Sequence, residues 1–134
     1  MQLELSERQF RRLLDMAYIG NWILNSTRGD DRITDYDEVE SNLFAAALEN
    51  GMSALAAPSP EGVLPSCAFT EGGIHEAIMD YEDTVFFEIL AEELARRDME
   101  QESLDQNDVD ELNSRISDYI SEFERNGTDN ISLK

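Results

Sequence analysis

The spacing of apolar residues most constrains the fold of this chain, because they recur three and four positions apart in several segments. That period matches one face of an α-helix, whereas a half-buried strand alternates. The pattern predicts helices over 6–26, 35–50, 74–81, 84–97 and 108–126. No two segments have the alternation of a strand pair. We therefore predict an all-α fold, a compact single-domain bundle of four to five helices.

The first predicted helix is the most apolar segment of the chain. Ser6 is a good N-cap, and Gln9 three residues later completes a capping box. Residues 16–24 are apolar nearly all round, which is typical of a helix buried on several sides. Gly20 inside it favours close approach of a neighbouring helix. The N-terminal helix is thus expected at the centre of the bundle.

The later helices have their own start and stop signals. Asp35, Asp83 and Asn107 are each expected to cap the helix that follows them. Gly127 marks the end of the last helix, and 127–134 reads as a loose tail.

Residues 58–73 read as a long loop, because they hold all three prolines and three of the seven glycines. Residues 26–33 read as a polar linker and 98–107 as a polar connector between helices. A length of 134 residues fits a single domain. We therefore predict one helical domain over 1–134.

The chain is strongly acidic, with 30 Asp and Glu against 10 Lys and Arg, a net charge of −20. Residues 1–32 hold five acids and five arginines, so 33–134 carry the whole imbalance. Lys134 is the one lysine. Scarce lysine fits genomic base composition, adaptation to high salt, or the use of arginine for bidentate contacts.

This composition excludes several classes of function. Binding phosphates needs clustered Lys and Arg, so we expect no direct nucleic-acid partner. A basic membrane-surface helix is excluded likewise, and no apolar run reaches the roughly 18 residues of a membrane span. Cys67 alone cannot build a disulfide scaffold, and the N-terminus does not read as a signal peptide. We expect a cytoplasmic protein.

Known catalytic and metal-binding motifs are not found. Cys67 and His75, eight residues apart, could form a nucleophile pair only if folding brought them into contact. Acids crowd two turns, 80–83 and 105–110, but the second departs from a calcium loop because Asp110 stands where glycine is needed. Helix caps and a solvated face explain these acids more simply. We predict no catalytic residues, no metal site and no cofactor.

Polar residues interrupt the apolar N-terminal helix. Asn21 and Asn25 are four apart and share a face, which Arg28 extends and Tyr18 precedes. Buried amides are costly unless they are hydrogen-bonded. They either tie down an adjacent loop or helix end, or they line a polar pocket in which Trp22 anchors a partner. The candidate binding residues are Tyr18, Asn21, Trp22, Asn25, Arg28, Tyr81, Arg97 and Asp98.

Two segments, YIGNWILN at 18–25 and DYEDTVFFEILAEELARRD at 80–98, carry a resemblance. The chain resembles an uncharacterised family of small bacterial helical proteins, to which no activity is attached. Phe87 stands where the family pattern has Trp. The resemblance implies a bacterial, cytoplasmic, all-helical protein. The matching residues are Tyr18, Gly20, Asn21, Trp22, Asn25, Tyr81, Thr84, Phe86, Leu90, Leu94, Ala95, Arg97 and Asp98.

Three functions remain open on the sequence. The first is a non-enzymatic protein-interaction or regulatory module, monomer or homodimer, whose acidic surface attracts a basic protein partner. The second is a small-ligand binder or enzyme with a polar site around Asn21, Asn25, Arg28 and Asp98. The third is a nucleic-acid mimic.

Overall fold

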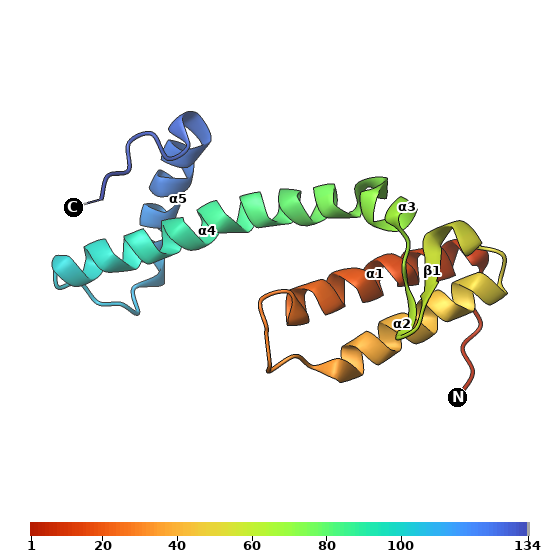
Figure 1. Ribbon diagram of the computed structural model, residues 1–134. Coiled ribbons are helices and arrows are strands. Elements are labelled where there is room, and N and C mark those ends of the chain that lie inside the picture. Colours follow the sequence, from red (N-terminus) through yellow and green to blue (C-terminus); the bar gives the residue numbers. More distant parts are fainter. Residues whose placement is uncertain (134) are drawn as a thin grey trace. The chain divides into compact units, whose positions relative to one another are not determined.

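The computed structural model describes residues 1–133, of which most are helical (Figure 1). They form two compact units, the N-terminal unit over 1–78 and the C-terminal unit from residue 79 onward. The elements in chain order are α1 (Glu7–Asn25), α2 (Thr34–Glu49), η1 (Ser53–Leu55), β1 (Ala56–Ser59), β2 (Gly62–Pro65), α3 (Cys67–Phe69), η2 (Thr70–Ile74), α4 (His75–Gln101) and α5 (Val109–Asn126).

The start of α1 confirms the predicted capping box. The Gln9 amide N–H donates to Ser6 Oγ at 3.2 Å, and the Ser6 N–H donates to Gln9 Oε1 at 2.9 Å. Two N–H groups that have no partner within the helix are thereby satisfied, which fixes where α1 begins.

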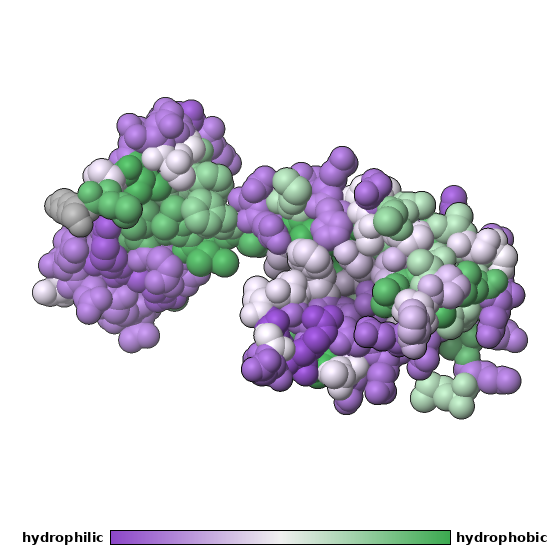
Figure 2. Space-filling model, in the orientation of Figure 1, coloured by the Kyte–Doolittle hydropathy of each residue, from purple (hydrophilic) through white to green (hydrophobic). Residues whose placement is uncertain are grey.

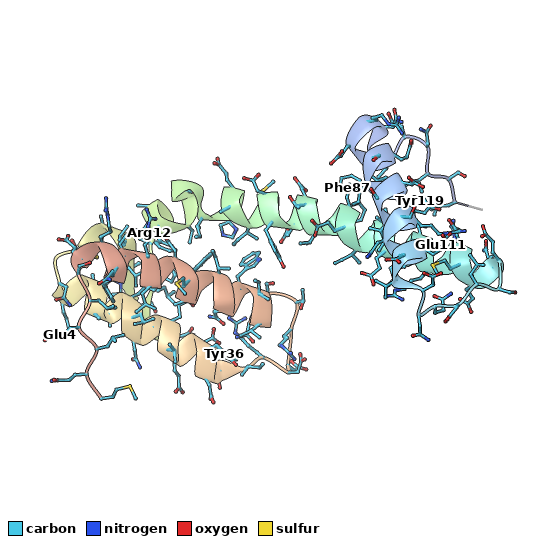
Figure 3. All side chains as sticks on the ribbon, turned by 180° about the vertical axis from the view of Figure 1, so that it is seen from behind. Glu4, Arg12, Tyr36, Phe87, Glu111 and Tyr119 are labelled. Atoms are coloured by element: carbon cyan, nitrogen blue, oxygen red, sulfur yellow. The ribbon has the colours of Figure 1, made fainter. Side chains whose placement is uncertain are left out.

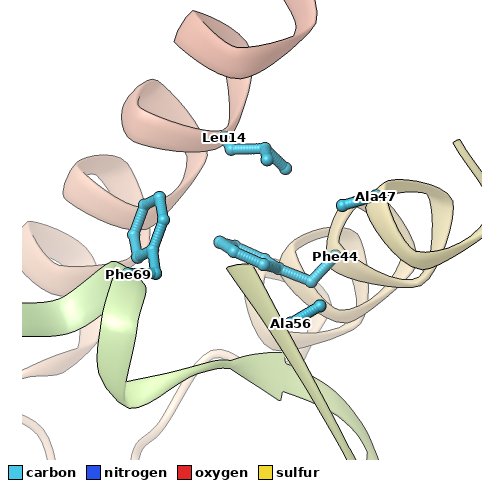
Figure 4. Packing of buried hydrophobic residues seen from close by; sticks show 5 residues of the cluster. All are labelled: Leu14, Phe44, Ala47, Ala56 and Phe69. Carbon is cyan, nitrogen blue, oxygen red and sulfur yellow. The ribbon is translucent and has the colours of Figure 1, made fainter. Parts of the chain in front are cut away.

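The core of the N-terminal unit lies where α1, α2, β1 and α3 meet (Figure 4). Phe44 and Phe69 meet edge to face with ring centroids 4.9 Å apart, an arrangement that aromatic rings favour. Truncating a fully buried side chain such as Leu14 to alanine costs about 3–5 kcal/mol. The buried residues of this core are Leu14, Phe44, Ala47, Ala56 and Phe69.

The structure corrects the prediction that α1 is a central helix buried on several sides. Met16 is 69% exposed and Ile23 59% exposed. A side chain at Gly20 would meet no atom within 4 Å, so no neighbour approaches closely there. Within its unit, α1 packs chiefly on α2 and the α3 turn, which cover one face only.

A small β-hairpin stands where the sequence predicts only a loop, so the fold is largely helical rather than all-α. β1 and β2 pair antiparallel, with Ala56 opposite Pro65 and Ser59 opposite Gly62. The two strands have no further neighbours, so prolines are tolerated at their edges. Pro60 and Glu61 form the turn. Gly62, the first residue of β2, has φ +127°, and a Cβ added there would lie 2.6 Å from Ser41 Oγ on α2.

Residues 75–101 form one helix, α4, where the sequence predicts two. Asp83 lies inside it rather than capping a second helix. No glycine or proline interrupts this stretch. Gly73, just before it, has φ +106°, which is not a helical conformation. A residue of a type that can cap, such as Asp83, is therefore insufficient to start a new helix, because aspartate is only mildly unfavourable in a helix interior.

Two other predicted caps are displaced. Residue 33, not Asp35, is the N-cap of α2, and Ile33 has no side chain that can cap. Asp108, rather than Asn107, caps α5 by accepting a hydrogen bond from the Glu111 N–H at 3.1 Å. Gly127 ends α5 as predicted, with φ +56°.

The C-terminal unit is built from α5 and most of α4. Its main buried cluster holds Ala95, Met99 and Leu112, with Ile116 and Tyr119 packed against it, and Ala91 and Phe123 are buried as well. Within residues 1–133, no helix combines the length and apolar character needed to cross a membrane. The single domain over 1–134 and the loose tail over 127–134 stay predictions.

Candidate functional sites

The structure divides the predicted site residues between the two units. Tyr18, Asn21, Trp22, Asn25 and Arg28 belong to the N-terminal unit, and Tyr81, Arg97 and Asp98 to the C-terminal unit.

Asn25 clamps the loop that leads from α1 into α2. Its Oδ1 accepts the Ile33 N–H at 2.8 Å, and its Nδ2 donates to the Ile33 carbonyl at 3.0 Å and to Asn21 Oδ1 at 2.7 Å. Ile33 is the N-cap residue that cannot cap with its own side chain. Asn25, only 1% exposed, thus fixes the start of α2 from the end of α1.

Asn21 extends this chain of hydrogen bonds onto α2. Its Nδ2 donates to Asp37 Oδ1 at 3.0 Å and to Glu40 Oε2 at 2.8 Å. Asp37 also receives two hydrogen bonds from Arg32, at 2.6 and 2.7 Å. In each of the two buried asparagines, the amide nitrogen therefore donates two hydrogen bonds and the carbonyl oxygen accepts one, and the interpretation that they tie a loop to a helix end describes them well.

Asp37 and Glu40, the two carboxylates that accept hydrogen bonds from Asn21, have pKa values shifted in opposite directions. The Arg32 hydrogen bonds, aided by Asn21, hold the pKa of Asp37 below its usual range. Burial raises the pKa of Glu40, and the hydrogen bond from Asn21 offsets this only in part. Glu40 is thus a half-buried carboxylate without an ion-pair partner among residues 1–133.

Aromatic rings stand beside these carboxylates. The Tyr18 and Trp22 rings are stacked with centroids 6.4 Å apart. His75, at the start of α4 but within the N-terminal unit, pairs its Nε2 with the Tyr18 hydroxyl at 2.6 Å and meets Trp22 edge to face at 4.7 Å. Burial, followed by the nearby Glu40 charge, raises the pKa of Tyr18, so its hydroxyl stays protonated at neutral pH.

These groups surround a hollow of about 230 Å³, which we call the N-terminal pocket. The sequence missed Arg32 and Glu40, although the Asp37–Glu40 spacing of three places both acids on the α2 face toward Asn21. Arg28 lies outside the pocket and binds the Leu24 carbonyl and Asp31. The lining residues are Tyr18, Asn21, Trp22, Asn25, Ser26, Arg32 and Glu40.

Cys67 and His75 are not arranged as a nucleophile pair. Cys67 is exposed and free, while the Nε2 atom of His75 is held by Tyr18. Among residues 1–133, no three His, Cys, Asp or Glu side chains gather in a way that would hold a metal ion.

In the C-terminal unit, Arg97 and Asp98 link α4 to α5. Asp98 accepts hydrogen bonds from the Tyr119 hydroxyl and from Arg97 Nη2, the latter at 2.7 Å. Burial alone would raise the pKa of Asp98, but the Tyr119 and Arg97 hydrogen bonds outweigh it and lower that pKa. Tyr81, 62% exposed, stands apart from this cluster on the surface of α4.

An apolar groove runs between α4 and α5, and we call it the C-terminal groove. Its volume is about 660 Å³. Figure 3 shows Phe87 on α4 and Tyr119 on α5, and Figure 2 shows a hydrophobic area on this unit between hydrophilic surfaces. The groove is lined by Phe87, Ile116, Ile120 and Phe123 and by the polar residues Thr84, Glu88, Glu92 and Glu124.

No protein family model matches the chain. No curated protein and no solved structure matches it significantly either.

Proposed function

We propose that this protein is a non-enzymatic interaction module whose C-terminal groove binds a basic amphipathic helix of a partner protein. The observation that carries the proposal is an apolar groove edged by carboxylates. Phe87, Ile116 and Ile120 supply its apolar surface, and Glu88 and Glu124 lie beside them. An amphipathic helix buries its apolar face in such a groove, and its basic residues complement the rim.

The small core of the C-terminal unit supports this assignment. Two helices alone cover little apolar surface: the main buried cluster holds Ala95, Met99 and Leu112, and Ala91 and Phe123 are the further buried apolar residues described in this unit. A unit of this size buries about 60% of the surface of its unfolded chain, so its stability margin is small. A third helix from a partner would cover the groove and complete a bundle of the kind expected from the sequence.

Charge favours a basic partner over a second copy of this chain. Residues 79–134 contain seventeen acids and five basic residues, a net charge of −12. A second copy would bring the same charge and repel it. Among the described residues, Glu88 and Glu124 make no ion pair, whereas Glu92 pairs with Arg96 at 2.8 Å. Two of the three rim carboxylates are therefore free to meet lysine or arginine.

The test is titration of the whole chain, residues 1–134, with a synthetic Leu/Lys amphipathic helix, alongside a Leu/Gln and a Leu/Glu helix of equal length. We expect the Leu/Lys helix to bind tightest and to lose affinity as NaCl rises from 20 to 300 mM, because salt screens exposed charges. Equal binding of all three helices would overturn the charge argument.

Rim variants locate the binding surface. Glu88→Gln combined with Glu124→Gln is expected to weaken Leu/Lys binding about tenfold at low salt, since two charge contacts are lost. The matched control changes Glu38 and Glu49, exposed acids of the N-terminal unit, to Gln. A control variant that weakens binding as much as the rim variant would contradict the assigned surface.

We propose further that the protein is cytoplasmic, that it is monomeric before it binds its partner, and that it belongs to the bacterial helical family. The apolar surface of the C-terminal groove favours a protein helix as the ligand and argues against a nucleic-acid mimic. A mimic presents spaced carboxylates to a basic surface and needs no apolar groove.

A further inference from the structure

We propose that the N-terminal pocket is a binding site for a primary alkylammonium group, held by Glu40 and the aromatic side chains of Tyr18 and Trp22. This site is independent of the C-terminal groove. Its ligand chemistry could come from a small free amine or from a lysine side chain of a protein, and the test below separates these two sources.

Glu40 supplies the charge for such a ligand. It lies on the pocket wall, half-buried, and only its Oε2 receives a hydrogen bond, from Asn21 at 2.8 Å. Its other oxygen has no donor among the residues described. An ammonium group donates up to three hydrogen bonds and would occupy that acceptor while neutralising the charge.

Arg32 does not already fill this role. Although it lines the same pocket, its guanidinium binds both oxygens of Asp37, at 2.6 and 2.7 Å. The charges of Arg32 and Asp37 therefore cancel locally. Glu40 leaves the pocket with one uncompensated negative charge, which favours a monovalent cation.

The aromatic side supplies a second, independent attraction. Tyr18 and Trp22 both line the pocket, and their rings lie within 25° of parallel. Cations are attracted to tyrosine and tryptophan faces. His75, which does not line the pocket, contacts both rings, through the Tyr18 hydroxyl and through the edge contact with Trp22. The aromatic wall is therefore formed before any ligand arrives, which lowers the entropic cost of binding.

The size of the pocket limits the ligand. A hollow of about 230 Å³ is below the range of roughly 300–1,000 Å³ typical of drug-sized ligands. A short alkylammonium chain, or the end of one lysine side chain, is of suitable size, and an adenine nucleotide or a long polyamine is not.

The experiment titrates the full chain with n-butylammonium chloride and follows two signals. These are the fluorescence of Trp22, the single tryptophan, and the side-chain amide resonances of Asn21 and Asn25. NaCl at equal ionic strength controls for screening, and n-butanol controls for the alkyl chain. We expect a saturable change with n-butylammonium alone. A response that NaCl or butanol reproduces would overturn the proposal.

Variants assign the binding to this pocket. Glu40→Gln is expected to weaken binding at least about tenfold, and Trp22→Leu, followed by the Asn21 resonance, about threefold, in line with a lost cation–π contact. Glu38→Gln removes an exposed charge two residues away and is expected to bind as the parent does. Unchanged binding by Glu40→Gln would refute the site, and its amide spectrum shows independently whether the variant is folded.

A second probe, the blocked tripeptide acetyl-Gly-Lys-Gly-amide, distinguishes a protein lysine from a free amine as the source of the ammonium group. Tighter binding of this peptide than of n-butylammonium assigns the site to protein lysine, and weaker binding assigns it to a free amine. Both results support an ammonium site, whereas failure of both probes overturns it. The Glu88→Gln and Glu124→Gln changes affect helix binding at the C-terminal groove, and Glu40→Gln affects ammonium binding at the N-terminal pocket, so either proposal can fail without the other.

Discussion

Asn25 replaces a missing helix cap with a buried side chain from the preceding helix. We expect Asn25→Ala to lower the free energy of unfolding by about 2 kcal/mol, because the Ile33 N–H and Asn21 Oδ1 lose their partners. Urea unfolding followed by Trp22 fluorescence measures the loss. Asn42→Ala, an exposed asparagine on α2, is the matched control and is expected to change stability little. Equal effects of the two variants would contradict a clamping role.

Glu40 and Asp37, three residues apart on α2, are expected to affect stability with opposite signs. The pKa of Glu40 is raised by burial above the 4.5 of an ordinary glutamate. The folded protein thus binds a proton at Glu40 more tightly than the unfolded chain does. Ionisation of Glu40 therefore lowers the free energy of unfolding as the pH rises above 4.5. Glu40→Gln should therefore raise the urea midpoint at pH 7, and the difference from the parent should shrink toward pH 4.5.

Asp37 is expected to affect the free energy of unfolding in the direction opposite to Glu40. Its pKa is lowered from 3.8, chiefly by Arg32, so its stabilising contribution is complete above 3.8 and is lost as the pH falls below it. Asp37→Asn should lower the urea midpoint at pH 7. Glu38→Gln controls for the general effect of removing one charge. Shifts of the same sign at positions 37 and 40 would refute the assigned environments.

Among the elements, α4 offers a direct test of why one helix forms where two were expected. Asp83 lies inside α4, so Asp83→Ala should leave stability unchanged or raise it by a few tenths of a kcal/mol, because alanine has the higher helix propensity. Asp108 does cap α5, and Asp108→Ala should cost about 1 kcal/mol. Circular dichroism during urea unfolding compares the two. A comparable loss for Asp83→Ala would indicate a helix start at Thr84.

The sequence predicted elements well where local signals agree and poorly where tertiary partners decide. The Ser6 capping box and Gly127 were correct because caps act within a few residues. The hairpin was missed because its strands are four residues each and contain prolines, which makes any alternation unreadable. Its position depends on α2, through Ser41, which no local pattern encodes.

The candidate site was predicted in part for the same reason. Spacing placed Tyr18, Asn21, Trp22 and Asn25 on neighbouring positions of one helix, and they do line one pocket. Their partners come from other elements, and nothing in the sequence pairs Asn21 with Glu40 or Tyr18 with His75. Arg28 was included only because it continues the spacing beyond the point where α1 ends.

For the whole molecule, the distribution of charge and buried residues predicts that the two units differ in stability. Among the described residues, six apolar side chains are buried in the N-terminal unit and eight more pack against its main cluster, whereas the C-terminal unit has five buried and two packed against its main cluster. Residues 79–134 also carry a net charge of −12 against −8 for 1–78, so self-repulsion weighs most on the smaller core. We therefore expect the C-terminal unit to unfold first in urea.

Two optical probes separate the units, because Trp22 reports on the N-terminal unit alone while far-ultraviolet circular dichroism includes α5. At 10 mM NaCl the circular dichroism signal should begin to fall at lower urea than the Trp22 signal. Raising NaCl to 150 mM should move this early phase upward more than the Trp22 phase, since screening relieves repulsion most where charge is densest. Coincident transitions that shift equally would instead establish the single cooperative domain predicted from the chain's length.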